Sequence, residues 1–483
     1  MVFSSFRFAG FLIAVLVLLS LIRSNDWRKR ALCLASCLFY AAWDYRYLGL
    51  LLLISGIDYV AAAQIDRTPV SSRRRAWMIF SIITNLGCLA YFKYTDFFIH
   101  SLNGILGGYG RSIPLLHVFL PAGISFYTFK SMSYTIDVYR RELRPCRTLI
   151  EYAMFVSFFP DLIAGPIVRA SVFLPQLDTI IGPTRTRLRD GGSLFLVGLG
   201  KKLLIADQVG PIADAVFQNP AAWSCGMAWT GLIAYTMQIY CDFSGYSDMA
   251  LGTTRMLGYD LPENFRMPYL AADVSEFWQR WHITLSQWLR DYVYIPLGGN
   301  RKGASRTYVN LMLTMLLGGL WHGAGWNFVF WGALHGAALC IHRAWKNFGF
   351  RMPRLAGQCL TLLFVALAWV PFRAVDAATT RSMLTRLVSP GTGGNHWLPV
   401  TVVAGLVLVV CGHVAGLWIE RARTSGGVIQ RLFDIRVKEH PLSGRQLVFG
   451  LATVGGAFLT TSVVLIVALF GALDSSPFIY FRF

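Results

Sequence analysis

The residues best suited to chemistry in this sequence are two histidines in the stretch GGLWHGAGWNFVFWGALHG, residues 318–336. His322 and His335 lie there among tryptophans, phenylalanines and glycines, after a long apolar run. A charged residue at mid-bilayer costs about 2.5–3.5 kcal/mol on insertion scales, so an ionisable group at that depth is a functional candidate. Each imidazole is therefore either neutral and bonded to a neighbouring helix, or a participant in chemistry.

Four glycines surround His322 and favour it over His335 as the reactive histidine. They are Gly318, Gly319, Gly323 and Gly325. Glycine has no side chain, so a ligand or another backbone can approach closely at such positions. On a continuous ideal helix, His335 would point about 220° away from His322. His335 shares a helix face with His342 instead, and we expect this pair to serve packing.

A third histidine, His282, lies in the polar and aromatic stretch of residues 264–306. Asp273 followed by Glu276 predicts a helix start with a capping box. Large side chains then recur at helical spacing: Trp278, Trp281, Leu285, Trp288 and Tyr292. This stripe predicts an amphipathic helix at the cytoplasmic membrane interface. The loop that follows, IPLGGNRKG (295–303), has glycines and basic side chains that suit an anionic group. This neighbouring loop makes His282 a candidate site residue, in preference to a merely solvated histidine at the interface.

A cluster of acidic residues lies in YCDFSGYSDMALG (240–252), with Asp242 and Asp248 in or near a predicted span. Pairing with a buried arginine, or capping of a broken helix, is favoured over catalysis for these side chains. The sequence has no GxxxxGK[ST] phosphate loop and no GxSxG nucleophile elbow. Its nine cysteines form no CxxC pair, so neither a disulfide framework nor a metal site is predicted.

The composition places these residues in a membrane protein. Of the 483 residues, 55% are hydrophobic and 14% are charged, against about 25% charged in soluble proteins. The net charge of +19 lies in short loops between apolar runs, as the positive-inside rule expects. That distribution, without a basic and aromatic surface module, argues against nucleic acid as a partner. The partner it indicates is the lipid bilayer.

A helix of about 20 apolar residues crosses a bilayer. The candidate runs are 7–22, 31–43, 47–63, 77–98, 118–138, 191–217, 226–250, 307–321, 324–342, 356–373, 398–419 and 446–471. The second and third form a hairpin around DYRY (44–47). The first run precedes its basic cluster, the reverse of a cleavable signal peptide, so we expect a retained span with the amino terminus outside. The predicted fold class is an all-α polytopic membrane protein.

One apolar stretch does not fit a simple span. FVSFFPDLIAGPIVRASVFLPQL (155–177) is broken by three prolines and a glycine. Non-helical backbone at membrane depth is tolerated only inside protein or beside a water-filled cavity. We therefore expect a re-entrant or interfacial segment over about 151–177.

Together and in this order, these stretches resemble the membrane-bound O-acyltransferase family, and within it the bacterial alginate O-acetylase branch. The matching stretches are MVFSS at the start, LPAGISFYTFKSMSYTIDVYR (120–140), FFPDLIAGPIVR (158–169), YCDFSGYSDMALG, MPYLAADVSEFWQRWHITLSQWLRDYVYIPLGGNR (267–301) and LTMLLGGLWHGAGWNFVFWGALHG (313–336). The LGGNR stretch favours this branch over the teichoic-acid D-alanylation branch. The resemblance implies an acyltransferase core over residues 1–375, with residues 376–483 as further transmembrane helices packed on it.

The resemblance also carries expectations about fold and function. It implies a ring of about 10–12 tilted transmembrane helices around a central tunnel, which an acyl thioester enters from the cytoplasm. The family's catalytic histidine falls on His322 and its second polar active-site position on His282. It further implies acetyl-CoA as donor, no permanently bound cofactor, a bacterial inner-membrane location, and periplasmic acetyltransferase partners that complete transfer to an exported polysaccharide such as alginate.

The residues themselves suit this chemistry. Acyl transfer from a thioester needs a base of near-neutral pKa, and histidine supplies one. His322 is the predicted base, and His282 would bond the thioester carbonyl or orient the acceptor. The predicted substrate-binding residues are Trp321, Trp326, Arg280, Arg290, Arg301, Lys302 and Asp242, with the four cations as contacts for the phosphates of coenzyme A.

Alternatives remain for the acceptor and for the class of protein. The acceptor could instead be cellulose, peptidoglycan, another glycan or a lipid, because partners outside this chain decide it. A transporter without chemistry of its own would carry inverted repeats and acidic sites at the membrane midplane. Only Asp242 and Asp248 meet that description, and no repeat is apparent.

Overall fold

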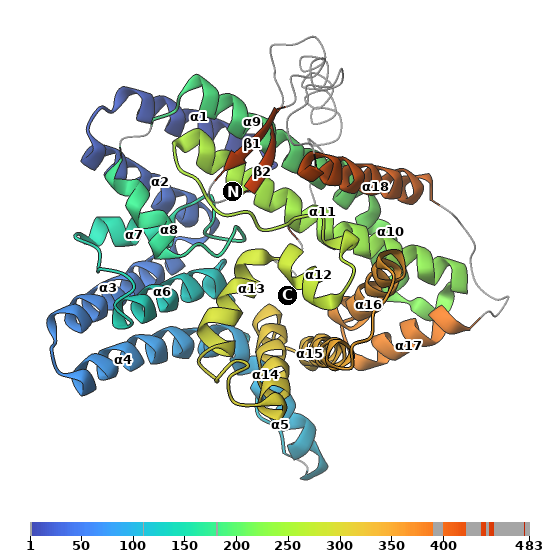
Figure 1. Cartoon of the computed structure of the whole chain (residues 1–483). Coiled ribbons are helices and arrows are strands. Elements are labelled where there is room, and N and C mark those ends of the chain that lie inside the picture. Colours follow the sequence, from blue (N-terminus) through green and yellow to red (C-terminus); the bar gives the residue numbers. More distant parts are fainter. Residues whose placement is uncertain are drawn as a thin grey trace. The chain divides into compact units, whose positions relative to one another are not determined.

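The computed structural model describes residues 2–109, 111–179, 182–389, 399–421, 436–440, 444–448 and 478. Packing divides the chain into two compact units, Met1–Gly192 with Ala250–Pro262, and Ser193–Met249 with Glu263–Phe483. The described elements are helices, apart from an antiparallel hairpin of β1 (Arg436–His440) and β2 (Gly444–Val448) (Figure 1). The predicted helical architecture is confirmed, with this short hairpin as an addition.

The first unit contains eight helices within the described residues: α1 (Phe6–Leu21), α2 (Asn25–Asp44), α3 (Arg46–Arg67), α4 (Ser71–Leu89), α5 (Thr95–Leu106), α6 (Ile124–Tyr139), α7 (Leu149–Ser157) and α8 (Ala170–Phe173). The break predicted at DYRY is confirmed, because only Tyr45 separates α2 from α3. α9 (Arg185–Gly200) and α11 (Cys225–Leu257) contribute residues to both units.

The second unit contains the stretches with candidate chemistry. Its further helices are α10 (Asp207–Gln218), α12 (Val274–Arg280), α13 (Ile283–Leu289), α14 (Ala304–His322), α15 (Trp326–Asn347), α16 (Arg354–Arg373), α17 (Ala377–Val388) and α18 (Val400–Arg421). The predicted runs at 307–321, 324–342, 356–373 and 398–419 correspond to α14, α15, α16 and α18. The run at 446–471 lies outside the described residues beyond β2. The predicted boundary at residue 375, between an acyltransferase core and further helices, depends on where the family motifs end. It stays a prediction.

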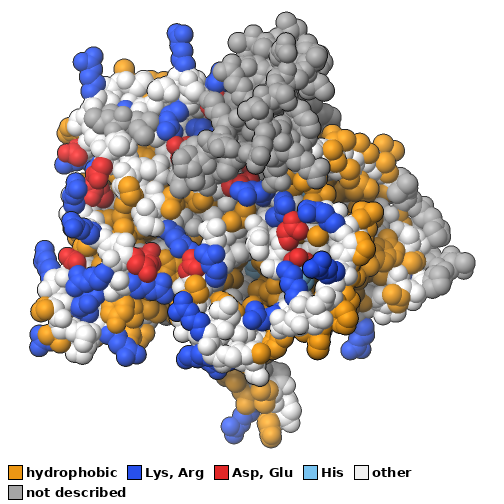
Figure 2. Space-filling view, viewed as in Figure 1, with side chains coloured by type: hydrophobic (Ala, Val, Ile, Leu, Met, Phe, Trp, Pro, Cys, Tyr) orange, Lys and Arg blue, Asp and Glu red, His pale blue; other side chains and the backbone are white. Residues whose placement is uncertain are grey.

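Four described helical segments are long and apolar enough to cross a membrane by length and composition. They are Arg46–Arg67, Ser71–Tyr109, Arg354–Arg373 and Val400–Leu417, and Phe6–Leu21 is a shorter apolar helix. The outward side chains of α18 are mostly apolar, and they form the orange area at the upper right of Figure 2. Such a surface suits lipid rather than water. The chain is therefore a multi-pass membrane protein.

The stretch predicted to be irregular at depth is irregular and buried in the first unit. α7 ends at Ser157, and turns and extended backbone follow up to Arg169. The side chains from Ser157 to Val168 are buried, including Asp161. Lys130 of α6 donates to both oxygens of Asp161, at 3.0 and 2.9 Å from Nζ. A buried carboxylate needs such a partner, so this ion pair holds the irregular segment inside protein.

The amphipathic helix predicted after Asp273 starts as expected but does not continue. The Asp273 carboxylate accepts from the backbone N–H of Glu276 at 2.8 Å, which caps α12. α12 ends at Arg280, and His282 adopts a left-handed backbone with φ 43° and ψ 54° before α13 begins. The single continuous helix was therefore wrong. A non-glycine residue in this conformation costs about 1–3 kcal/mol, and such strain gathers at functional sites.

The same break buries the predicted aromatic stripe. Four of its five members are buried, namely Trp278, Trp281, Leu285 and Trp288. An interfacial helix would expose these rings to lipid headgroups. They pack instead in the interior of the second unit.

α14 and α15 form an antiparallel hairpin joined at Gly323–Gly325 (Figure 1). A methyl group at Gly319 would collide with the backbone oxygen of Phe328, and one at Gly332 with that of Met315. Small residues allow such close helix packing in membranes. Gly323 likewise faces the Phe328 ring, so the interpretation of these glycines as room for a ligand was wrong for Gly319 and Gly323.

Candidate active site

The side chain of His282 is fully buried and held by one amide in the second unit. Its Nδ1 lies 3.1 Å from Oδ1 of Asn264. The same oxygen accepts from the backbone N–H of Thr284 at 3.3 Å and from its hydroxyl at 2.9 Å. His282 occupies the N-cap position of α13 on left-handed backbone, but its imidazole makes no capping hydrogen bond and contacts Asn264 instead.

This arrangement fixes the tautomer of His282. The backbone N–H of Thr284 can only donate, so the Asn264 atom that faces both groups is the oxygen. That oxygen can only accept, so Nδ1 of His282 carries the proton. Burial lowers the pKa of His282 to about 3, so the ring is neutral near pH 7. Its Nε2 therefore presents a lone pair, and no donor in the described part of the chain bonds to it.

His322 closes α14 and lies within an aromatic enclosure. Its side chain is buried, and its ring centroid lies 5.0 Å from Trp321, 5.1 Å from Trp331 and 5.3 Å from Phe372. The ring centroids of His322 and His282 are 6.4 Å apart. The two histidines that the sequence analysis selected therefore lie together, although 40 positions separate them in the chain.

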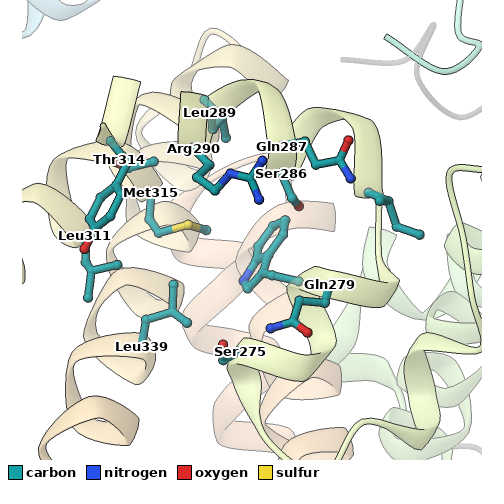
Figure 3. Close-up of a pocket in the computed structure, with 13 residues that line it drawn as sticks. Ser275, Gln279, Ser286, Gln287, Leu289, Arg290, Leu311, Thr314, Met315 and Leu339 are labelled. Carbon is teal, nitrogen blue, oxygen red and sulfur yellow. The ribbon is translucent and has the colours of Figure 1, made fainter. Parts of the chain in front are cut away.

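A pocket of about 360 Å³ lies between α12, α13, α14 and α15 (Figure 3). Its polar lining comes from α12, α13 and the turn after it, and includes Ser275, Gln279, Ser286, Gln287 and Arg290. The apolar lining comes from all four helices and includes Trp278, Ile283, Leu289, Leu311, Met315 and Leu339. A mainly apolar pocket with several polar groups along α12 and α13 suits an elongated ligand with methylene and amide groups.

Neither His282 nor His322 lines this pocket, and intervening side chains connect its wall to them. Met315 lies seven residues before His322, so both occupy one face of α14 two turns apart. Gly318 stands between them on that face, and a methyl group there would contact Leu289 at 3.1 Å. The pocket wall residue Trp278 packs on Trp331 with 5.7 Å between ring centroids, and Trp331 packs on His322.

The structure separates the four cations that we expected to contact coenzyme A. Arg290 lines the pocket (Figure 3), and its guanidinium donates to both carboxylate oxygens of Asp291, at 2.6 and 3.1 Å. Arg280 donates to Glu276 at 2.9 Å and to the backbone oxygen of Arg266 at 3.2 Å. Arg301 and Lys302 are exposed and line neither described pocket. Arg290 is thus the cation placed to meet a ligand there.

The remaining predicted residues divide in the same way. Trp321 contacts both histidines, with its ring centroid 5.9 Å from that of His282. Trp326 is 66% exposed and lies outside the pocket. Asp242 forms a buried ion pair with Lys202 at 2.7 Å, in agreement with the structural interpretation of this acid. The cation is a lysine rather than the expected arginine.

Comparison with known proteins identifies the family to which this chain belongs. The model of the membrane-bound O-acyltransferase family matches residues 140–370. Probable alginate O-acetylase AlgI of Pseudomonas aeruginosa is 43% identical over 399 residues, which cover 81% of this chain and 76% of that protein. The chain belongs to the membrane-bound O-acyltransferase family. It is accordingly a multi-pass membrane O-acyltransferase.

Two further relatives act on cell-wall polymers, according to their names, and differ in their identity to this chain. The peptidoglycan O-acetyltransferase of Helicobacter pylori is 40% identical over 390 residues, covering 74% of this chain and 73% of that protein. The teichoic acid D-alanyltransferase of Streptococcus thermophilus is 31% identical over 238 residues, covering 46% and 57%. The predicted resemblance to the O-acetylase branch, rather than the D-alanylation branch, agrees with these values.

Sequence reasoning missed three residues that shape the site of this acyltransferase. Asn264 orients His282, and Trp331 and Phe372 enclose His322. The sequence offered one signal for Asn264, which is a polar amide residue at the start of the segment that contains His282. Trp331 lies inside the stretch that drew attention to His322. Nothing in the sequence around Phe372 signals its place against the histidine.

Among the described residues, no group of three or more histidine, cysteine, aspartate or glutamate side chains is placed to hold a metal ion. The sequence expectation that the site needs no metal stays a prediction.

Proposed function

We propose that this acyltransferase moves acetyl groups from cytoplasmic acetyl-CoA across the inner membrane for O-acetylation of an exported polysaccharide such as alginate. The observation that carries this proposal is the meeting of His282 and His322 in the unit that also holds a mainly apolar pocket with polar groups along α12 and α13. The relatives named as O-acetylases, at 40–43% identity, support acetyl as the transferred group.

The reaction assigns a separate task to each histidine. An acceptor hydroxyl attacks the thioester carbonyl carbon, a C–O bond forms, and the hydroxyl proton passes to His322 as general base. The C–S bond then breaks, and the coenzyme A thiolate takes that proton as it leaves. The neutral Nε2 of His282 accepts a hydrogen bond from a second donor group of the acceptor, separate from the hydroxyl whose proton goes to His322, and so orients the acceptor.

The pocket suits the donor. The pantetheine arm of coenzyme A has amide groups for the side of Gln279 and Gln287, and methylene groups for the side of Leu311 and Leu339. Arg290 lines the pocket and would turn its guanidinium from Asp291 to a phosphate of the donor. The contacts of Arg280, Arg301 and Lys302 with coenzyme A stay predictions.

The choice of acceptor rests on the names of the relatives and not on side chains of this protein. Alginate fits the relatives of Pseudomonas and Azotobacter, and peptidoglycan fits the relative of Helicobacter pylori. A periplasmic acetyltransferase partner would receive the acetyl group and complete its transfer to the polymer. The acetyl content of each isolated polymer, in cells with and without this protein, distinguishes the two acceptors.

The decisive variant is His322→Ala. We expect loss of polymer acetylation at unchanged protein abundance, because the base that accepts the hydroxyl proton is gone. His100→Ala is the matched control, since His100 is an exposed histidine of α5 in the first unit and should retain full acetylation. Wild-type acetylation with the His322 variant would contradict the proposal. Release of free coenzyme A by the purified wild-type protein separates an enzyme from a transporter.

A further inference from the structure

The tautomer of His282 raises a question about the thioester carbonyl. In the transition state of acyl transfer, negative charge develops on the carbonyl oxygen, and preorganised N–H donors stabilise it. A neutral His282 protonated on Nδ1 has no N–H on Nε2, so it cannot donate to this oxygen. The donors must come from other side chains.

Two buried indole N–H groups are candidates, that of Trp331 beside His322 and that of Trp278 on the pocket wall. Nε1 of Trp278 and Nε1 of Trp331 are both buried, and neither has a hydrogen-bond acceptor in the described part of the chain. Indole nitrogen can only donate. An unsatisfied buried donor costs about 1–3 kcal/mol, and most buried polar groups in proteins have a partner. A ligand oxygen would supply the acceptor that these two donors lack.

The two tryptophan rings lie between the pocket and His322, the proposed general base. Trp278 lines the pocket assigned to the donor, and its ring lies against Trp331 at an angle of 71°. The Trp331 ring stands nearly perpendicular to that of His322, at 88°. A thioester that reaches from the pocket to His322 passes these two rings.

We propose that the indole N–H groups of Trp278 and Trp331 bind the carbonyl oxygen of the donor thioester and stabilise the oxyanion during transfer. The assignment rests on the proposed function. As the acceptor oxygen bonds to the carbonyl carbon, the C=O electron pair moves to the carbonyl oxygen, and both N–H groups donate to it. When the C–S bond breaks, the C=O bond re-forms and the sulfur leaves with the electron pair.

The carbonyl stretch of bound acetyl-CoA reports these hydrogen bonds directly. Acetyl-CoA labelled with ¹³C at the carbonyl is added to the full-length His322→Ala protein in detergent, where turnover is blocked. N–H donors withdraw electron density from the oxygen and lower the stretching frequency. We expect the band of bound ligand to shift to higher frequency in His322→Ala combined with Trp278→Phe or Trp331→Phe, since each variant keeps a ring and loses one donor.

Kinetics provides the second measurement. Trp278→Phe and Trp331→Phe, each made alone, should lower kcat by roughly 10²–10³-fold, the usual effect of losing one oxyanion donor. KM for acetyl-CoA should change little. Trp229→Phe is the control, because Nε1 of Trp229 donates to the backbone oxygen of Leu387 at 3.0 Å. It removes an indole N–H of the same unit outside the site and should keep wild-type kcat.

The outcomes separate this inference from the proposed function. Absence of a bound ¹³C-carbonyl band in the His322→Ala protein would contradict acetyl-CoA as donor. A bound band with the same frequency in the parent and in both phenylalanine variants, or unchanged kcat in both single variants, would overturn the indole assignment while leaving the acyltransferase function in place.

Discussion

His282 and His335 are both fully buried histidines of the second unit, but they are held in different ways. His282 bonds to Asn264 through Nδ1 and sits on strained, left-handed backbone. His335 lies within regular helix α15, and neither of its nitrogens bonds to a polar atom in the described residues. Aromatic rings surround it, among them Trp331 at 4.7 Å and Phe364 at 5.2 Å between centroids.

Burial alone therefore does not mark a reactive histidine in this membrane protein. What distinguishes His282 is a fixed proton on one nitrogen and a lone pair on the other, supplied by a polar partner. The backbone strain is a second mark, since it persists only where surrounding contacts enforce it. His335 has neither feature, so we expect its ring to act as part of the aromatic packing.

Replacement of His282 by leucine should have the largest effect. The variant loses the lone pair that orients the acceptor, and misplacement of a reacting group by about 1 Å can cost about 10²-fold in rate. We expect kcat for acetyl transfer to fall by about 10²-fold, measured in detergent with labelled acetyl-CoA. Equal kcat in the variant and the wild type would remove His282 from the site.

An intermediate effect is expected from Asn264→Asp, and it depends on pH. Burial keeps the pKa of His282 near 3, so the wild-type ring stays neutral from pH 5 to 8. A carboxylate beside the ring favours the imidazolium and raises this pKa. The protonated Nε2 no longer accepts, so kcat/KM of the variant should fall at the acidic end of this range, at a higher pH than for the wild type. Superimposable profiles would contradict the assigned hydrogen bond.

The same lowered pKa affects the stability of the wild-type protein. The folded pKa of His282 lies below its usual value of 6.5, so below pH 6.5 the unfolded chain binds a proton that the folded chain does not. The contribution of this site to the free energy of unfolding is therefore complete above pH 6.5. It declines as the pH falls from 6.5 towards 3.

The sequence was sufficient for the helices and for the histidine pair. Hydrophobic runs with basic loops located α1 to α4 and α14 to α16, because bilayer thickness fixes the length and composition of such segments. The motif resemblance selected His282 and His322, and the structure places their rings 6.4 Å apart. No local pattern in the sequence predicts that two residues 40 positions apart lie close together, so this prediction depended on the family resemblance.

The errors share one physical origin. Helical phase was applied across Gly323–Gly325 and across Trp281–His282, where the chain changes direction. Tertiary contacts decide such breaks: the first lets α15 pack against α14, and the second turns His282 towards Asn264. Spacing along a sequence cannot reveal a partner on another element, and the oriented lone pair of His282 depends on that partner.

The smallest effect is expected from His335→Leu, the matched counterpart of the leucine variant at His282. Leucine is close in volume to histidine, and it removes two nitrogens that make no hydrogen bond with the described residues. Loss of ring contacts costs about 0.5–1.5 kcal/mol for each aromatic pair, and removal of the unsatisfied polar atoms offsets part of this cost. We expect kcat within about fivefold of wild type and a melting temperature within a few degrees. A loss of kcat as large as in His282→Leu, at unchanged melting temperature, would show that His335 takes part in the reaction and that polar partners do not identify the reactive histidine.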